Sequence, residues 1–415
     1  MKIWLTEIGE PLPLTPGRRL MRAGLLAEAL SAAGHDVTWW TSTFDHVAKV
    51  HRLPNQDTVT LAANYRIELL HARGYSSNHS LARMRHQHRI AKAFGRRAPG
   101  APQPDLVYCC VPTLEVTDVA VRYAVRRGVP VVVDVRDLWP DVFLDAVPRG
   151  LRLLARVALH GQFRRAARIF RQATAIVAVS QSYLEWALRY AARPRGRWDG
   201  VFPHGYPTET IAPEELDRAR QLLTAMGVDG RRVICTFVGT FGHSYDLAPV
   251  ILTARRMLAA GDRRVLFVLA GDGERAAEWR ALADGLTNVV FTGWLSAAGI
   301  ATLLGMSSVG VAAYVAGAAQ GLPNKIFEFL SAGLPVLSSL RGEAEALLEE
   351  SGCGLTYSAG EAASFSAALE RLLADPGGGQ AMACRARARF EADFRADQVY
   401  PALTRHLESV VTAAR

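Results

Sequence analysis

Short runs of β-branched and aromatic residues alternate with segments of helical periodicity along the whole chain. This alternation is typical of βα units that build a parallel sheet. The runs that predict strands are residues 2–6, 35–41, 65–70, 106–110, 129–135 and 175–180 in the first half, and 232–239, 265–270, 289–292, 309–314 and 334–338 in the second. The pattern therefore predicts an α/β protein with two doubly wound, Rossmann-like domains.

Two stretches break the pattern. Residues 193–213 are rich in proline and glycine, and the charge balance changes sign there, while residues 376–379 (PGGG) precede a final helical segment. These breaks predict domains over residues 1–200 and 201–397. Two such sheets facing each other across a hinge would form a cleft at the carboxyl ends of their strands, where ligands of open α/β sheets bind.

The composition is that of a globular protein. Half of the 415 residues are hydrophobic and 21% are charged. No apolar run reaches the roughly 18 residues of a membrane span, and Glu7 and Glu10 lie where a signal peptide would be apolar. We therefore expect a cytoplasmic protein. The five cysteines show no C-x-x-C spacing, which argues against a disulfide framework and a zinc site.

Positive charge is concentrated in the first half. Residues 1–200 hold 29 Lys and Arg against 16 Asp and Glu, whereas residues 201–415 hold 19 against 23. Residues 81–97 and 149–171 combine arginines with apolar residues at near-helical spacing, which predicts docking on the anionic inner membrane. The alternative is a core-packed helix with a solvated arginine face. No nucleic-acid-binding motif is present, so no specific nucleic-acid partner is predicted.

The densest motif is GLPNKIFEFLSAGLPVLSS at residues 321–339. It resembles the donor-site motif of glycosyltransferase family 4, which reads approximately P-N-K-x-F-E-Y-x-A-x-G-x-P-V and belongs to the GT-B fold of two Rossmann-like domains. FVGTFG at 237–242, LAGDGE at 269–274 and NVVFTGWLS at 288–296 follow the order of that family. The resemblance therefore covers nearly the whole chain.

The resemblance implies a nucleotide-sugar donor site. A buried Glu328 would accept the ribose hydroxyls, while Lys325 and the helix-terminal amides near Pro323 and Asn324 would neutralise the diphosphate. The alternative is a surface ion pair of Lys325 and Glu328 at i and i+3. Gln320 stands where the family's first glutamate usually contacts the donor sugar.

Two glycine-containing turns complete the expected donor site. Gly239, Thr240 and Gly242 follow one predicted strand, where closely spaced glycines let backbone amides approach phosphate. Gly271 and Gly273 follow the next strand and are expected to line the base and ribose. Thr240 occupies a position that is an arginine in many family members, so Lys325 and main-chain amides would carry more of the diphosphate. The alternative is a plain strand-to-helix turn for the first segment and a simple tight turn for the second.

In the first half, VVVDVRDLWPD at residues 131–141 ends a predicted strand. Many family members place a histidine here, and this variant resembles a subgroup of bacterial surface-polysaccharide glycosyltransferases with R-D-L-W-P. The hypothesis is that Asp137 orients or partly deprotonates the acceptor hydroxyl, while Arg136 braces Asp137 or binds phosphate. The alternative is a structural ion pair between the two residues.

The acceptor side is expected in the loops after the first two predicted strands. Gly17, Arg18, Arg19 and Arg22 lie at a helix start, and clustered arginines would suit an acceptor that carries phosphate. His46 follows the second strand. A solvent-facing loop residue is the alternative for His46.

Taken with the resemblance, these residues predict a retaining hexosyltransferase. Sugar would pass from a nucleotide-sugar, expected to be a UDP-sugar, to a polysaccharide or polyprenyl-diphosphate-linked acceptor in the synthesis of lipopolysaccharide or another surface glycan. The helix over 398–415 would return to the N-terminal domain. Without a D-x-D motif or histidine cluster, we expect no metal and no cofactor, with Lys325 assisting departure of the diphosphate. A sugar-nucleotide epimerase or hydrolase, or a non-catalytic nucleotide-sugar-binding protein, are the alternatives.

Overall fold

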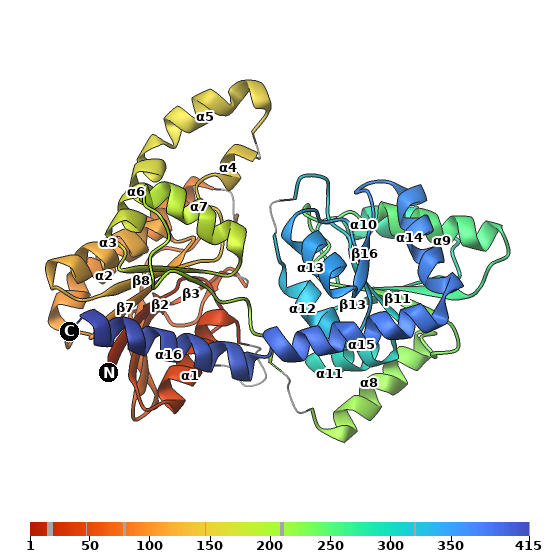
Figure 1. The fold of residues 1–415 in the computed structure, drawn as a ribbon, viewed down its shortest axis with the longest axis horizontal. Helices are drawn as coiled ribbons and strands as arrows, with labels where there is room; N and C mark the ends of the chain where they lie inside the picture. The colour runs from red at the N-terminus through yellow and green to blue at the C-terminus, as the bar shows by residue number, and fades with distance from the viewer. Residues whose placement is uncertain are drawn as a thin grey trace. The chain divides into compact units, whose positions relative to one another are not determined.

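The computed structural model describes residues 1–14, 20–46, 48–77, 80–145, 147–207, 211–318 and 321–414. The chain forms two compact units (Figure 1). Unit 1 comprises residues 1–205 and 396–415, and unit 2 comprises residues 206–395. Both units contain a predominantly parallel sheet between two layers of helices, so the predicted fold class is confirmed.

The sheet of unit 1 has the order β10-β9-β8-β7-β1-β2-β6-β5. Every neighbouring pair is parallel except β5 and β6, which pair antiparallel. A separate hairpin of β3 (Phe44–Asp45) and β4 (Val50–His51) follows β2. The sheet strands are β1 (Lys2–Thr6), β2 (Asp36–Ser42), β5 (Asp57–Ala62), β6 (Tyr65–Leu70), β7 (Leu106–Val111), β8 (Val131–Val135), β9 (Ala175–Ala178) and β10 (Gly200–Val201).

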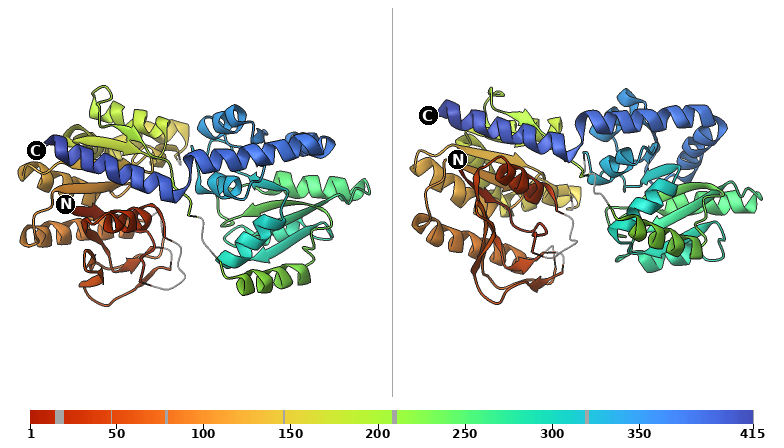
Figure 2. Two further views of the ribbon diagram at one scale, coloured as in Figure 1. Left: turned by 60° about the horizontal axis from the view of Figure 1, so that its bottom comes forward. Right: turned by 90° about the horizontal axis from the view of Figure 1, so that it is seen from below.

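Helices cover both faces of this sheet. One face packs against α2 (Leu81–Arg97), α3 (Leu114–Arg126), α6 (His160–Gln172) and α7 (Gln181–Ala191). The other face packs against α1 (Arg22–Ala32) and α16 (Ala396–Ala414), which lie side by side although they come from opposite ends of the sequence (Figures 1 and 2). The short elements are η1 (Ala98–Gly100), α4 (Val142–Asp145), η2 (Arg149–Leu151) and α5 (Arg152–Ala158).

Burial on both faces explains the composition of the central strands. Every residue of β7 (LVYCCV) and of β8 (VVVDV) is buried, as expected for parallel strands that are covered on both sides. Asp134 in β8 is the one charged residue in these two strands. Since its side chain has no exposed surface, the carboxylate needs a charged partner.

The sheet of unit 2 is parallel throughout and has the order β13-β12-β11-β14-β15-β16. Its strands are β11 (Val233–Val238), β12 (Val265–Ala270), β13 (Val289–Gly293), β14 (Val309–Ala312), β15 (Val336–Ser338) and β16 (Gly354–Thr356). One face packs against α8 (Pro213–Ala225), α11 (Ala297–Met306), α12 (Asn324–Ser331), α13 (Glu343–Ser351) and α15 (Pro376–Asp393), and the other against α9 (Ala248–Ala259), α10 (Ala276–Leu282) and α14 (Ala362–Ala374).

Candidate functional site

Two glycine turns meet at the carboxyl ends of β11 and β12. The backbone N–H of Gly239 donates to Ala270 O at 2.9 Å, and that of Phe241 donates to Asp272 O at 2.8 Å. A Cβ on Gly271 would lie 1.9 Å from Gly239 O, and one on Gly273 would lie 2.8 Å from Phe241 O. Since both glycines also have positive φ angles, only glycine fits these positions. The two turns are therefore packed backbone against backbone.

The ammonium group of Lys325 lies against the first of these turns. A Cβ added to Gly239 would come within 2.6 Å of Lys325 Nζ. The same atom is 3.9 Å from the ring centroid of Phe237 and 5.1 Å from that of Tyr245, distances typical of cation–π contacts. The side chain is only 7% exposed. This burial lowers the pKa of Lys325 to about 8, while the nearby Glu328 carboxylate acts in the opposite direction.

Glu328 lies one helical turn beyond Lys325 on α12. Its side chain is buried, and Oε1 accepts a 2.8 Å hydrogen bond from the hydroxyl of Tyr206. Because Lys325 and Glu328 are both buried, the alternative of an exposed surface pair is wrong. Tyr206 was not among the predicted residues, and nothing in its sequence neighbourhood distinguishes it.

The other predicted residues of unit 2 lie around this pair. Pro323 caps the start of α12 and Asn324 is its first residue, and both are half-buried. Thr240 is exposed on the loop between β11 and α9, and a Cβ on Gly242 would meet only Thr240 Cγ2, at 3.9 Å. Gln320 lies outside the described residues. Unit 2 thus brings a buried cation, a buried carboxylate and two glycine turns together.

Unit 1 contains a buried cluster of charges centred on Asp134. Arg22 donates to both carboxylate oxygens of Asp134, at 2.9 and 3.1 Å, and to Pro203 O at 2.8 Å. Arg136 binds Asp134 and Glu10. The two guanidinium groups hold the pKa of Asp134 well below its usual range. The charged ends of Arg22 and Arg136 are therefore engaged by carboxylates of unit 1 itself.

Glu7 adds a third carboxyl group to the two of this cluster. It follows β1, and its Oε2 is buried without a hydrogen-bond partner among the described residues. Burial raises the pKa of Glu7 to about 8, against the lowering effect of Arg136. Burial also raises the pKa of Glu10, so both Glu7 and Glu10 are harder to ionise than solvated carboxyl groups.

Asp137 does not pair with Arg136. Its Oδ1 accepts the backbone N–H of Leu138 at 2.8 Å, so the predicted alternative of an Arg136–Asp137 ion pair is wrong. Burial raises the pKa of Asp137, and Arg83, whose guanidinium lies 4.9 Å from the ring centroid of Trp139, lowers it. Asp137 is therefore a partly desolvated carboxyl group on the loop that follows β8.

His46 lies directly after β3 and is half-buried. Its Nδ1 is hydrogen-bonded to the hydroxyl of Tyr75 at 2.5 Å. Burial, followed by the charge of Lys49, lowers the pKa of His46 to about 4, so the ring is neutral at neutral pH. Gly17, Arg18 and Arg19 lie outside the described residues.

The described residues form neither a metal-binding cluster nor a membrane-spanning helix. The described part of the chain holds no group of three or more His, Cys, Asp or Glu side chains placed to bind a metal ion. None of its described helices combines the length and the apolar composition that a membrane span requires.

Two family models match the chain, one in each half. Residues 22–209 match the family described as Glycosyltransferase Family 4, and residues 232–375 match Glycosyl transferases group 1. A search of curated protein sequences finds no match. Together with the two α/β units, the family models identify the chain as a glycosyltransferase of the GT-B fold.

Solved structures of similar fold cover almost the whole chain. The sucrose-phosphate synthase of Thermosynechococcus elongatus has a TM-score of 0.74 and 17% identity, with 99% of each chain covered. HepE of Anabaena, solved with UDP-glucose, has a TM-score of 0.65 and 18% identity, with 99% of this chain and 100% of that chain covered. WaaG, a glycosyltransferase involved in lipopolysaccharide biosynthesis, has a TM-score of 0.65 and 15% identity, with 99% of each covered.

Proposed function

We propose that the protein transfers a hexose from a nucleotide-sugar, held by unit 2, to a glycan or lipid-linked acceptor, held by unit 1. The observation that carries this proposal is the placement of Lys325 Nζ against the Gly239 turn, with the Glu328 carboxylate one helical turn away. A buried cation at a glycine turn provides a site for the diphosphate of the donor. HepE, solved with UDP-glucose, supports a UDP-sugar as the donor class.

Each group has a distinct role toward this donor. Lys325 neutralises the diphosphate, and the amides at the start of α12 and in the Gly239 and Gly271 turns supply neutral donors. Glu328, oriented by Tyr206, accepts the hydroxyls of the ribose. Thr240, Gly242 and Gly273 line the same strand ends, and Gln320 is assigned to the sugar.

The reaction we propose retains the anomeric configuration. The bond from the anomeric carbon to the diphosphate oxygen breaks, the acceptor oxygen bonds to the same face of that carbon, and the acceptor proton passes to the departing diphosphate. Lys325 stabilises the negative charge that develops on this leaving group, without a metal ion. Asp137 orients the acceptor hydroxyl, and its burial makes the carboxylate a better hydrogen-bond acceptor than a solvated one.

Toward the acceptor, we assign Arg22 and Arg136 to shaping the loops of unit 1 through Asp134 and Glu10, and His46 to contact with the acceptor. Gly17, Arg18 and Arg19 would complete that side. We further propose that the acceptor is a surface glycan or its polyprenyl-diphosphate-linked precursor, handled at the cytoplasmic face of the inner membrane. WaaG, a glycosyltransferase involved in lipopolysaccharide biosynthesis, supports this acceptor class.

A binding experiment tests the donor site. Thermal shifts are measured with UDP, GDP and dTDP and their hexose conjugates for the wild type, Lys325→Ala and Glu328→Gln, with exposed Lys92→Ala as the matched control. We expect one nucleotide to stabilise the wild type and the control but neither site variant. If no nucleotide stabilises the wild type, or if Lys325→Ala binds as well as wild type, the proposal is wrong.

Product analysis then separates the enzyme classes. Incubation with the stabilising nucleotide-sugar and no acceptor should release little free sugar and form no epimer. Rapid turnover of the donor alone would instead identify a hydrolase or an epimerase. Donor binding with no product from any glycan or lipid-linked acceptor would favour a non-catalytic nucleotide-sugar-binding protein.

A further inference from the structure

Unit 1 exposes an apolar surface on η2 and α5. Leu151, Leu153, Leu154 and Val157 are 51%, 74%, 67% and 69% exposed, and no residue of α5 is buried. Helix α5 packs against η2, α4 and α6 and extends away from the sheet of unit 1 (Figure 1). Because large apolar side chains cost free energy in water, four of them within seven residues indicate a surface that is covered by a partner.

The same segment is strongly basic. Residues 146–184 contain no Asp or Glu, and they include Arg149, Arg152, Arg156, Arg164, Arg165, Arg168 and Arg171. On α6, Arg165 binds Glu115 and Arg168 binds Asp118, both from α3, so part of this charge is neutralised within unit 1.

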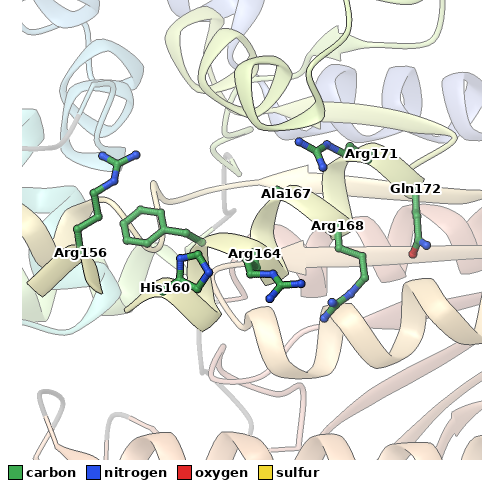
Figure 3. A pocket seen from close by; sticks show the side chains of 8 residues that line it. Arg156, His160, Arg164, Ala167, Arg168, Arg171 and Gln172 are labelled. Carbon is green, nitrogen blue, oxygen red and sulfur yellow. The ribbon is translucent and has the colours of Figure 1, made fainter. Parts of the chain in front are cut away.

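Other arginines line an open groove beside α5. The groove is formed by Arg156, His160, Phe163, Arg164, Ala167, Arg168, Arg171 and Gln172. Figure 3 shows the side chains of Arg156, Arg164 and Arg171 at separate points along the two helices, and all three residues are exposed. Arg156 also lies over the ring of Phe163, with 5.1 Å to the centroid. The groove therefore presents exposed guanidinium groups next to the exposed leucines.

The combination of basic and apolar side chains indicates which kind of partner covers this surface. A second copy of this surface would bring like charges together, and a nucleic acid would leave Leu153, Leu154 and Val157 in water. An anionic bilayer accommodates both, because its phosphates bind guanidinium groups while the acyl boundary takes up the apolar side chains.

We propose that the surface formed by residues 151–157 and the adjacent groove of α6 docks unit 1 onto an anionic phospholipid bilayer. Leu153, Leu154 and Val157 enter the acyl boundary, and Arg156, Arg164 and Arg171 bind lipid phosphates. The inference rests on the proposed function only for the role of the docking, which is to bring unit 1 to a lipid-linked acceptor. The docking itself depends on this surface alone.

Flotation of the full chain with liposomes tests the docking. The vesicles are pure phosphatidylcholine or an equal mixture of phosphatidylcholine and phosphatidylglycerol, at low and high salt. The wild type should float with the anionic vesicles and bind the neutral ones at least about tenfold less, because the arginines contribute electrostatically. Added salt should weaken the binding, since it screens that attraction.

Two sets of variants locate the surface. The triple variant Leu153→Ser, Leu154→Ser and Val157→Ser should bind anionic vesicles at least about tenfold less tightly, since three apolar groups are removed from the acyl boundary. A matched control with Val125→Ser and Leu222→Ser, which are 47% and 64% exposed on α3 and α8, should bind as wild type does. Arg164→Gln with Arg171→Gln should lose affinity for anionic vesicles and most of its salt dependence.

The outcomes distinguish the docking from the proposed function. The inference is overturned if the wild type stays unbound with anionic vesicles, if the triple variant floats normally, or if the triple variant abolishes a dimer seen by light scattering. The thermal shift with nucleotides is measured on the same variants and should be unchanged. Loss of the nucleotide shift in the wild type would refute the proposed function while leaving the docking result intact.

Discussion

Replacing Lys325 with methionine is expected to stabilise unit 2 and to abolish donor binding. Methionine fills nearly the same volume in the contacts with Phe237 and Tyr245 and carries no charge. In the wild type, the ammonium is buried before any diphosphate is present, which costs free energy. Lys325 therefore lowers the stability of unit 2, but its charge is already in place to bind the diphosphate.

The magnitude follows from the pKa of Lys325. Its value falls from 10.5 to about 8 on folding, and this shift already includes the favourable attraction of Glu328. At about 1.4 kcal/mol for each pKa unit, the charged form is disfavoured in the folded state by about 3 kcal/mol at neutral pH. Lys325→Met should therefore raise the free energy of unfolding of unit 2 by up to about 3 kcal/mol.

The downward direction of the pKa shift of Lys325 predicts how the stability of unit 2 depends on pH. Between about pH 8 and 10.5 the unfolded state binds more protons at Lys325 than the folded state, so the stability of the wild type rises with pH relative to that of the variant. The advantage of Lys325→Met should be full below about pH 8 and should shrink toward zero near pH 10.5.

Hydrogen exchange of peptides from β11 and β12, read by mass spectrometry at pH 7 and above pH 9, reports the stability of unit 2 directly. Lys92→Met, an exposed control in unit 1, should change neither value. Faster exchange in Lys325→Met than in wild type, or an advantage that does not shrink at high pH, would refute the reasoning.

Three further substitutions test the geometry. Asp134→Asn leaves two buried guanidinium groups without their shared carboxylate. Urea denaturation should show a free energy of unfolding of unit 1 that is lower by about 3–5 kcal/mol. The control Asp57→Asn, at an exposed position, should change this free energy by less than about 0.5 kcal/mol. Gly239→Ala places a Cβ 2.6 Å from Lys325 Nζ and should weaken nucleotide binding at least about tenfold by calorimetry, whereas Gly261→Ala, with no atom within 4 Å of its Cβ, should bind normally. Tyr206→Phe removes the hydrogen bond to Glu328 and should weaken nucleotide binding about tenfold; Tyr190→Phe, which loses a similar bond to Asp141, should not. Wild-type affinity in Gly239→Ala or Tyr206→Phe, or wild-type stability in Asp134→Asn, would contradict the corresponding contact.

The sheet strands of the core could be predicted because burial on both faces demands unbroken apolar runs. The strand ranges 2–6, 65–70 and 265–270 agree with β1, β6 and β12 to the residue. The edge strands β5, β10 and β16 were missed. In β5 most side chains are exposed, and the other two are only two and three residues long, so neither leaves a hydrophobic signal in the sequence.

Part of the candidate site could also be predicted, and the rest depends on contacts between distant segments. Lys325 and Glu328 lie in one motif, so the sequence alone places them together. Tyr206 reaches Glu328 across 122 residues of chain, and Glu10 reaches Arg136 across 126. Asp134 did leave a local signal, because a carboxylate inside the buried run VVVDV requires a cationic partner, but the identity of Arg22 as that partner is set only by packing.

The return of the chain to unit 1 after residue 395 bears on how the protein folds during synthesis. Leu403, Leu407 and Val410 of α16 complete the apolar layer over the face of the sheet that α1 covers only in part. A ribosome synthesises unit 2 before these residues, so unit 1 lacks part of the helical layer on this face until α16 has been made. Unit 2, whose chain is continuous from 206 to 395, can fold first, while unit 1 can complete its core only after the last helix has been made.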